Sequence, residues 1–365
     1  MPATVAGRLK RMGDADLYDY DLPPELIAQE PLADRTAARL LVVDRHTGGL
    51  THRHVRDLPG LLTPGDLVVV NDTMVVPARL LGHRVGTGGK WEGLFLRVER
   101  EGDQAGNWVV LAQTRGRPEP GERVRLTTRD ADAADAVEIE LVGRAAGGAW
   151  LARPLVDASA EELLARVGRV PLPGYLRGGH EQPGDLERYQ TVFARVAGSA
   201  AAPTAGLHFT DELFARLAAR GVGRATVTLH VGLGTFRPIS AASLDDHEMH
   251  SEWCVCPPET VAAIERTKAR GGRVIAVGTT AMRTLETASR SGDAAPFVGP
   301  TDLFIRPGFP FHAVDCLLTN FHMPRTTLMV LVSTFASREL IARAYAEAIR
   351  ERYRFLSYGD AMLIL

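Results

Sequence analysis

The sequence of 365 residues predicts an α/β fold in which a largely parallel sheet domain with helices is interrupted by an inserted small β-barrel domain. After residue 156, strand-like and helix-like segments alternate, which is typical of a parallel sheet covered by helices. Between residues 63 and 155, short apolar runs are broken by turn residues about every ten positions, as in a barrel. We therefore expect a discontinuous α/β catalytic domain over 15–62 and 156–365, and an inserted barrel over 63–155.

Composition limits the class of protein. With 45% hydrophobic and 24% charged residues the chain is globular, and no run approaches the roughly 18 apolar residues of a membrane span. The basic N-terminal stretch lacks the apolar segment of a secretory signal, and three cysteines are too few for a disulfide framework. We expect a cytoplasmic protein. Its net charge of −2 means that any nucleic acid must be held by a local patch.

Each part of the chain contributes its own elements. PPELIAQ predicts a short helix and RLLVVDR a strand near the N-terminus. The inserted domain is expected to use seven strand-like runs, GDLVVVN, VPARLLGHRV, WEGLFLRVER, WVVLAQT, ERVRLTT, VEIELVGR and AWLARPL. Ser159 and Glu162 then form a capping box, and Thr210 caps the helix that begins at Asp211.

The rest of the chain alternates strands with helices. DLERYQTVFARV predicts a helix with Leu186, Tyr189, Val192 and Phe193 on one face. Strands are expected at ATVTLHV, RVIAVG and CLLTN, and helices at PETVAAIERTKARGG, TAMRTLETAS and TTLMVLVSTFASRELIARAYAEAIRERY. This order predicts a parallel sheet in which the loops that follow the strands lie together at the carboxyl edge.

Three histidines lie where such loops are expected. His208 lies in PTAGLHF, His230 ends ATVTLH, and His322 follows CLLTNF. One histidine alone is more often structural, but three at equivalent positions indicate a ligand site beyond the strand ends. The neighbouring glycines permit close approach of a ligand or a turn; they are Gly206, Gly232 and Gly234.

Two further motifs contain residues suited to ligand binding. VIAVGTTAMRTLE places Gly278, Thr279 and Thr280 between a strand and a helix whose N–H groups suit an anion, although a plain turn fits equally well. DDHEMHSEWCVC is rich in histidine and acidic residues but lacks a zinc spacing, so we expect a polar loop and no metal. Histidines 46, 52 and 54 are expected to be exposed.

Basic residues in the inserted domain offer contacts for RNA. Arg115 and Arg117, with Arg123 and Arg125, predict either a phosphate-facing stripe or a solvated strand face. Tyr175 and Arg177 in LPGYLR suit base stacking and phosphate contact, or packing.

A series of motifs in one order resembles the S-adenosylmethionine:tRNA ribosyltransferase-isomerase family of queuosine biosynthesis. The likeness runs from about Tyr18 to the last residue. It is carried by YDLPPELIAQEP, RLLVVDR, GDLVVVNDT with VPARLLG, YQTVFA, AAPTAGLHFT, TLHVGLGTFRPI, HEMHSEW, VIAVGTTAMRTLE, TDLFIRPGF, TNFHMPRTTLMVLVSTFA and YRFLSYGDAM.

The resemblance implies a reaction and its partners. Members transfer and isomerise the ribosyl part of S-adenosylmethionine onto 7-aminomethyl-7-deazaguanine at the wobble position of tRNA, giving epoxyqueuosine, adenine and methionine. The co-substrate is S-adenosylmethionine, the partner is the precursor tRNA, and neither a membrane nor an obligate protein partner is expected. Because a base must remove a proton from C5′ and an acid must assist adenine, the catalytic candidates are His208, His230 and Glu252.

The resemblance also predicts the binding residues. For S-adenosylmethionine they are Thr204, Gly206, Phe209, Gly232, Gly234, Thr235, Phe236, Gly278, Thr279, Thr280, Arg283, Asn320, Phe321, His322 and Asp360. For tRNA they are Arg79, Arg115, Arg117, Tyr175 and Arg177.

The chain departs from the family pattern at one informative place. Where the family reads NNTRV, residues 71–75 read NDTMV, so an arginine is missing and a carboxylate is gained. Two alternatives therefore stay open beside the tRNA enzyme. One is a paralogue that uses the same donor on a free deazapurine or another acceptor, and the other is an inactive RNA-binding homologue.

Overall fold

The computed structural model describes residues 13–99, 101–129, 136–232, 239, 241 and 243–365. The chain divides into two compact units, which are described separately. Unit 1 comprises the chain up to Asn71 together with Pro203–Leu365, and unit 2 comprises Asp72–Ala202. No helix of the described residues is long and apolar enough to cross a membrane.

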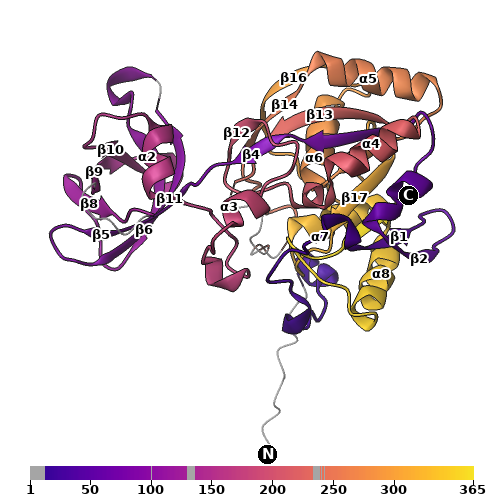
Figure 1. The fold of residues 1–365 in the computed structure, drawn as a ribbon, viewed down its shortest axis with the longest axis horizontal. Coiled ribbons are helices and arrows are strands. Elements are labelled where there is room, and N and C mark those ends of the chain that lie inside the picture. The colour runs from indigo at the N-terminus through magenta and orange to yellow at the C-terminus, as the bar shows by residue number, and fades with distance from the viewer. Residues whose placement is uncertain (1–12, 100, 130–135, 233–238, 240, 242) are drawn as a thin grey trace, which may run out of the picture. The chain divides into compact units, whose positions relative to one another are not determined.

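Unit 1 contains a nine-stranded sheet (Figure 1). Its strand order is β16-β14-β13-β3-β15-β17-β18-β1-β2. In that order the bounds are Phe297–Thr301, Glu252–Cys256, Gly223–Leu229, Leu67–Asn71, Val274–Val277, Cys316–Asn320, Ala361–Ile364, Arg39–Val43 and Leu50–His54.

The four central strands, β13, β3, β15 and β17, pair in parallel. Every residue of β3, β15 and β17 is buried, as expected for strands covered on both faces. The predicted largely parallel sheet with helices is thereby confirmed.

The strand GDLVVVN lies in this sheet and not in the barrel. Leu67–Asn71 forms β3, between β13 and β15. Its unbroken Leu-Val-Val-Val run is typical of a parallel strand buried on both faces, whereas barrel strands alternate. Unit 1 therefore extends to Asn71, beyond the expected boundary at residue 62.

Helices of unit 1 after the barrel follow the expected order, with one break. The helices of unit 1 are α1 (Leu58–Leu61), α4 (Asp211–Ala219), α5 (Pro258–Ala269), α6 (Thr279–Ala288), α7 (Thr327–Ala336) and α8 (Arg338–Arg350). At PPELIAQ only the 3₁₀ turn Pro24–Leu26 forms, and α1 was not predicted. The single long helix expected over 326–353 is split because Ser337 adopts φ +93° and its side chain caps α8 at the N–H of Leu340 (3.3 Å). Thr210 caps α4 as predicted.

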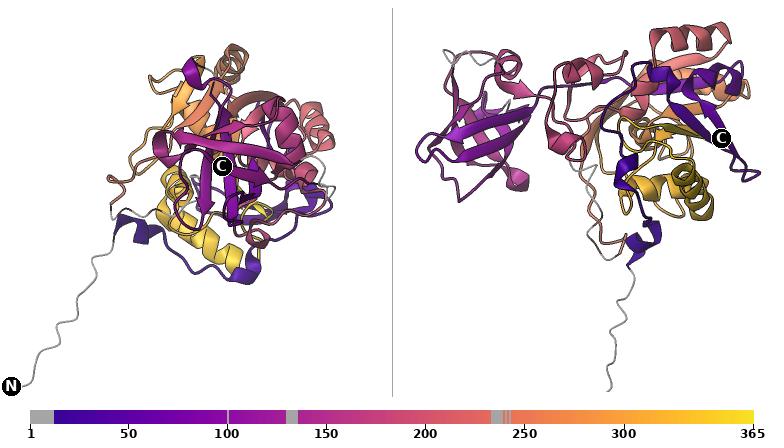
Figure 2. Two further views of the ribbon diagram at one scale, coloured as in Figure 1. Left: turned by 90° about the vertical axis from the view of Figure 1, so that its left-hand side faces the viewer. Right: turned by 60° about the horizontal axis from the view of Figure 1, so that its bottom comes forward.

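Unit 2 contains the predicted barrel (Figure 2). A seven-stranded antiparallel sheet runs β11-β5-β6-β7-β10-β9-β8, and a further pairing of β5 with β8 closes it. In that order the bounds are Gly168–Arg169, Arg79–Arg84, Lys90–Val98, Trp108–Thr114, Trp150–Pro154, Val137–Arg144 and Glu122–Leu126. Its core includes the buried Trp91, Trp108 and Trp150.

Helix α2 (Ala160–Val167) also belongs to unit 2. It has the predicted capping box of Ser159 and Glu162. Its apolar face, formed by Leu163, Leu164 and Val167, packs into the barrel core, so the insertion continues past the expected boundary at residue 155.

The prediction of a single helix over DLERYQTVFARV is wrong. Only α3 (Asp185–Arg188) is helical, and the chain then pairs with β4 (Thr73–Val75) through β12 (Val196–Ser199). Gln190 explains the break, because its side chain accepts from the N–H of Val75 (3.0 Å) and donates to the carbonyl of Val75 (2.7 Å).

Candidate active site at the carboxyl edge of the parallel sheet

The four central strands end at one edge of the sheet. Their last residues are Asn71, Leu229, Val277 and Asn320. The antiparallel strands β14 and β18 begin at this edge, which adds Glu252 and the residues before Ala361. Loops separated by up to about 300 residues in the sequence therefore meet there, as predicted for open parallel sheets.

The PTAGLHF segment lies at this edge. It forms a 3₁₀ helix, Thr204–His208, whose first hydroxyl donates to Oδ1 of Asn320 (2.9 Å). A Cβ added to Gly278 would lie 3.6 Å from that of Ala205, so the segment also approaches the end of β15. Gly206 is buried within the 3₁₀ turn.

Both ring nitrogens of His208 face carbonyl oxygens. Nδ1 lies 3.1 Å from the oxygen of Ala205, and Nε2 lies 3.0 Å from that of Gly359. Burial lowers the pKa of His208, which favours the neutral ring with a single N–H donor. The imidazole therefore joins two loops inside the protein.

His230 differs from His208 in exposure. It directly follows β13, its backbone N–H donates to the oxygen of Trp253 (3.0 Å), and the residue is partly exposed. Of the three catalytic candidates, His230 is the one that is not buried.

Glu252 forms a buried ion pair with Arg283. Both side chains are 4% exposed, and Nη1 of Arg283 donates to Oε2 of the carboxylate. The other carboxylate oxygen accepts from the N–H of Gly232 (2.9 Å). Nε of Arg283 donates to the oxygen of Leu303 (3.1 Å), while its buried Nη2 has no hydrogen-bond partner among the described residues.

The N-terminus of α6 lies between these groups. Gly278 adopts φ +89°, a conformation that favours glycine, and its N–H donates to the oxygen of Leu318 (2.8 Å). Thr279 and Thr280 are buried in the first turn. The first N–H groups of a helix have no partner within it, so this turn can receive an anion.

The TNFHMP segment is fixed by internal hydrogen bonds. Asn320 donates to the oxygen of Leu356 (3.2 Å), and Nε2 of His322 lies 2.9 Å from the hydroxyl of Thr319. Burial lowers the pKa of His322 to about 3, so the ring is neutral at ordinary pH. The backbone N–H of His322 donates to the hydroxyl of Tyr345 (2.9 Å).

Two phenylalanines expected to bind S-adenosylmethionine lie in the core. Phe321 is 0% exposed and packs against Tyr345 and Phe355, with ring centroids 5.3 and 5.0 Å apart. Phe209 stacks on Phe214 at 5.0 Å. Gly234, Thr235 and Phe236 lie outside the described residues.

Asp360 connects two backbone segments. Its carboxylate accepts from the N–H of Arg39 and from the N–H of Arg354, both at 2.8 Å. These contacts hold the loop before β18, which includes Gly359 and thus one contact of His208.

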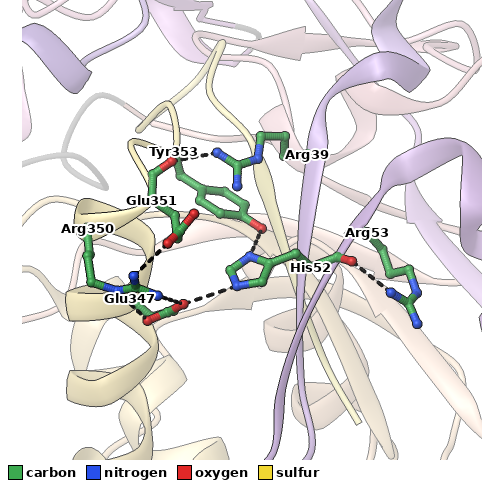
Figure 3. Close-up of polar contacts among 7 residues, drawn as sticks. All are labelled: Arg39, His52, Arg53, Glu347, Arg350, Glu351 and Tyr353. Carbon is green, nitrogen blue, oxygen red and sulfur yellow. Dashed lines mark hydrogen bonds and ion pairs between the residues drawn. The ribbon is translucent and has the colours of Figure 1, made fainter.

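A separate polar cluster joins β2 and α8 (Figure 3). His52 is not a bare loop residue, because its ring lies 2.8 Å from the Tyr353 hydroxyl and 3.1 Å from Glu347. Its side chain remains 40% exposed. The described residues contain no group of three or more His, Cys, Asp or Glu side chains that would hold a metal ion.

The residues expected to contact tRNA fall into two groups in unit 2. Arg79 is paired with Glu92 (2.7 Å) and Arg177 with the buried Asp185, so both hold the unit together. Arg115 and Arg117 are exposed, while Tyr175 is half-buried.

The unusual carboxylate Asp72 is also accounted for within unit 2. It is 1% exposed and accepts from Arg195 (2.8 Å), whose side chain is 71% exposed. The gained carboxylate is therefore internally paired.

Sequence reasoning missed Asn71. This residue is 0% exposed and contacts both Leu229 and Thr280. Its signal was a lone amide at the end of an apolar strand run, which acquires meaning only once that strand is placed in the parallel sheet.

Comparison with known proteins agrees with the predicted resemblance. The family described as queuosine biosynthesis protein matches residues 15–364. Two similar proteins are named S-adenosylmethionine:tRNA ribosyltransferase-isomerase. The one from Symbiobacterium thermophilum is 51% identical, and the alignment covers 95% of this chain and 98% of the relative's chain. The other, from Azoarcus sp., is 52% identical and covers 95% and 96%.

A solved structure is similar in fold. The S-adenosylmethionine tRNA ribosyltransferase from Thermotoga maritima superposes with a TM-score of 0.54 at 36% identity, covering 96% of this chain and 100% of that chain. The chain therefore belongs to the queuosine biosynthesis protein family.

Proposed function

We propose that this protein transfers and isomerises the ribosyl part of S-adenosylmethionine onto 7-aminomethyl-7-deazaguanine in tRNA, in the cytoplasm. The products are epoxyqueuosine in the tRNA, adenine and methionine. The proposal is carried by one observation: the family motifs converge on the carboxyl edge of the sheet, where a ligand site is expected.

We assign the proton transfer at C5′ to His230. An imidazole has an ordinary pKa near 6.5 and can exchange a proton near neutral pH. His230 is partly exposed at the strand end, whereas the imidazole of His208 is enclosed between two carbonyl groups. His208 then acts by holding the 3₁₀ segment against the loop at Gly359.

Glu252 is assigned a positioning role. Its carboxylate is shared between Arg283 and the N–H of Gly232, so it fixes the loop two residues after His230. Both oxygens of this carboxylate already accept internal hydrogen bonds, so it is poorly placed to take a proton from the donor.

The carboxylate of the methionine part would bind at the N-terminus of α6. The first-turn N–H groups supply donors, and the remaining donor of Arg283, Nη2, is buried and without a partner among the described residues. Because Glu252 already neutralises this arginine, the helix N–H groups carry most of the anion binding.

The exposed Arg115 and Arg117 are proposed to contact tRNA phosphates. Replacing either with glutamine should weaken tRNA binding and reduce the slope of log affinity against log salt by about 1. An unchanged slope would remove that arginine from the interface.

The direct test of the function mixes purified protein, S-adenosylmethionine and precursor tRNA, and follows adenine and the modified nucleoside by mass spectrometry. The proposal predicts adenine release together with epoxyqueuosine. Adenine release only with the free deazapurine would favour the paralogue, and no adenine at all would indicate an inactive homologue.

A further inference from the structure

Strand β3 leaves the sheet two residues before its neighbour β13 ends. The last paired position joins Asn71 to Val227, and the next residue, Asp72, already belongs to unit 2. Strand β13 continues to Leu229. Alternate residues of a strand direct their N–H and C=O groups to opposite sides, and His230 donates towards β14 at Trp253. Leu229 therefore directs its backbone groups to the side that β3 has left.

The side chain of Asn71 takes the place of the missing strand. Its Oδ1 accepts from the N–H of Leu229 at 2.9 Å, and its Nδ2 donates to the carbonyl of Leu229 at 3.0 Å. These two bonds have the pattern of one more ladder step. An amide suits this place because it carries both an acceptor and donors.

A third contact joins the same side chain to α6. Nδ2 of Asn71 also donates to the hydroxyl of Thr280 at 3.1 Å, within a site that is 0% exposed. One amide thus connects the residue before His230 with the first turn of the helix. These are the two places to which the proposed function assigns proton transfer and carboxylate binding.

We propose that Asn71 is a positioning residue. It keeps His230 and the N-terminus of α6 at the distance from each other that ribosyl transfer requires. The inference rests on the proposed function. Displacement of a reacting group by about 1 Å is enough to lower turnover about 100-fold, so the effect on rate can exceed the effect on folding.

The opposite end of β3 offers a matched control. Asp66 is 1% exposed and accepts from the backbone N–H of Arg273 (3.0 Å), the guanidinium of Arg273 (2.6 Å) and the N–H of Thr63 (2.8 Å). It is as buried and as well bonded as Asn71, but it lies at the amino edge. Asp66→Asn should lower the thermal midpoint and leave kcat and KM unchanged.

The experiment compares wild type, Asn71→Ala, Asn71→Asp and Asp66→Asn. For each protein we would measure the thermal midpoint, the affinity for S-adenosylmethionine by calorimetry, and kcat and KM for adenine release. Asn71→Ala should lose about 100-fold in kcat while still folded at the assay temperature. Asn71→Asp keeps the acceptor for the Leu229 N–H but sets a carboxylate oxygen against the Leu229 carbonyl, so it should not recover that loss.

The kinetic result decides between a positioning and a purely structural role. If Asn71→Ala lowers the thermal midpoint as Asp66→Asn does but leaves kcat and KM unchanged, the proposal is overturned. Hydrogen exchange tests the role of Asn71 separately from the proposed function. The Leu229 amide should exchange faster in Asn71→Ala whatever reaction the protein catalyses. Faster exchange with no adenine release from wild type would refute the proposed function, and unchanged exchange would refute the role of Asn71.

Discussion

At the amino edge of the central sheet, carboxylates close the strand starts, whereas the loops at the carboxyl edge are joined by neutral amide, hydroxyl and imidazole groups as well as by the carboxylates of Glu252 and Asp360. Before β15, Arg273 forms an ion pair with Asp66 at 2.6 Å. Asp315, before β17, accepts from the N–H of Val274 at 2.8 Å. At the carboxyl edge, Thr204 binds Asn320 at 2.9 Å.

The contrast separates stability from ligand binding. A carboxylate that already accepts several internal hydrogen bonds has little capacity left for a ligand, so the carboxylates at the amino edge stabilise the fold. Neutral polar groups both donate and accept, and they are cheaper to keep buried than charges. The ion pair of Glu252 with Arg283 lies at the carboxyl edge. Its carboxylate also accepts from the loop residue Gly232, and one donor of Arg283 has no partner among the described residues.

The largest expected effect comes from His230→Ala. Removing a general base typically costs about 100- to 10,000-fold in rate, and a partly exposed residue should not unfold the protein when shortened. Adenine release measures the loss, with His52→Ala as control, since the ring of His52 bonds to Tyr353 and Glu347 and to no residue of the proposed donor site. Near-normal turnover of His230→Ala would remove this residue from the mechanism.

Glu252→Gln should give the next largest effect. It leaves the buried Arg283 without its charge partner, which typically costs about 3–5 kcal/mol. Urea unfolding measures the loss, and kcat should also fall because glutamine has one acceptor oxygen and cannot accept from both Gly232 and Arg283. The double variant Glu252→Gln with Arg283→Met should recover stability but not turnover; recovery of both would mean that the pair only stabilises the fold.

Arg273→Gln tests the amino edge with a smaller effect. The variant removes the guanidinium from the buried Asp66 and should cost about 1–3 kcal/mol of unfolding free energy. Because this edge has no proposed part in the reaction, kcat and KM should match those of wild type. A kinetic defect at a temperature where the variant is folded would contradict the division between the two edges.

The two edges should also lose stability in different pH ranges. Burial lowers the pKa of His322 from 6.5 to about 3, and burial lowers that of His208 too. Below pH 6.5 the unfolded chain therefore binds more protons, and the stability that is complete above pH 6.5 is lost as the pH falls towards 3. Each histidine contributes a slope of up to about 1.4 kcal/mol per pH unit.

Asp66 responds only at lower pH. Burial raises its pKa, but the hydrogen bonds from Arg273 outweigh burial and hold the pKa below 3.8. Its contribution is therefore complete above about pH 4 and is lost below it. The free energy of unfolding, measured with urea between pH 7 and 4, should fall less steeply with decreasing pH for His322→Gln than for His52→Gln. Equal pH dependences would contradict this assignment.

Most of the fold followed from local patterns in the sequence. The barrel strands alternate, the caps at Ser159 and Thr210 begin helices, and the strand-helix alternation after the barrel gives the parallel sheet. The errors arose where a distant partner overrides the local pattern. Gln190 ends a helical pattern by binding Val75, and Ser337 breaks an apolar helical run by adopting a positive φ.

The location of the candidate site was also predictable, because parallel strands bring their last residues together. The role of each residue within the site was not predictable. His208 and His230 occupy similar motifs, and only their surroundings show that one is enclosed between carbonyls while the other is partly exposed. Asn71 was missed because its role depends on where β3 leaves the sheet.

Hydrogen–deuterium exchange with and without S-adenosylmethionine tests the central claim most directly, because it locates the donor without requiring turnover. We expect protection of residues 204–208, 278–281 and 320–322 at the carboxyl edge, and no change at 63–66 and 315–316 at the amino edge. Protection at the amino edge, or confined to unit 2, would contradict the assignment of the donor site to the carboxyl edge.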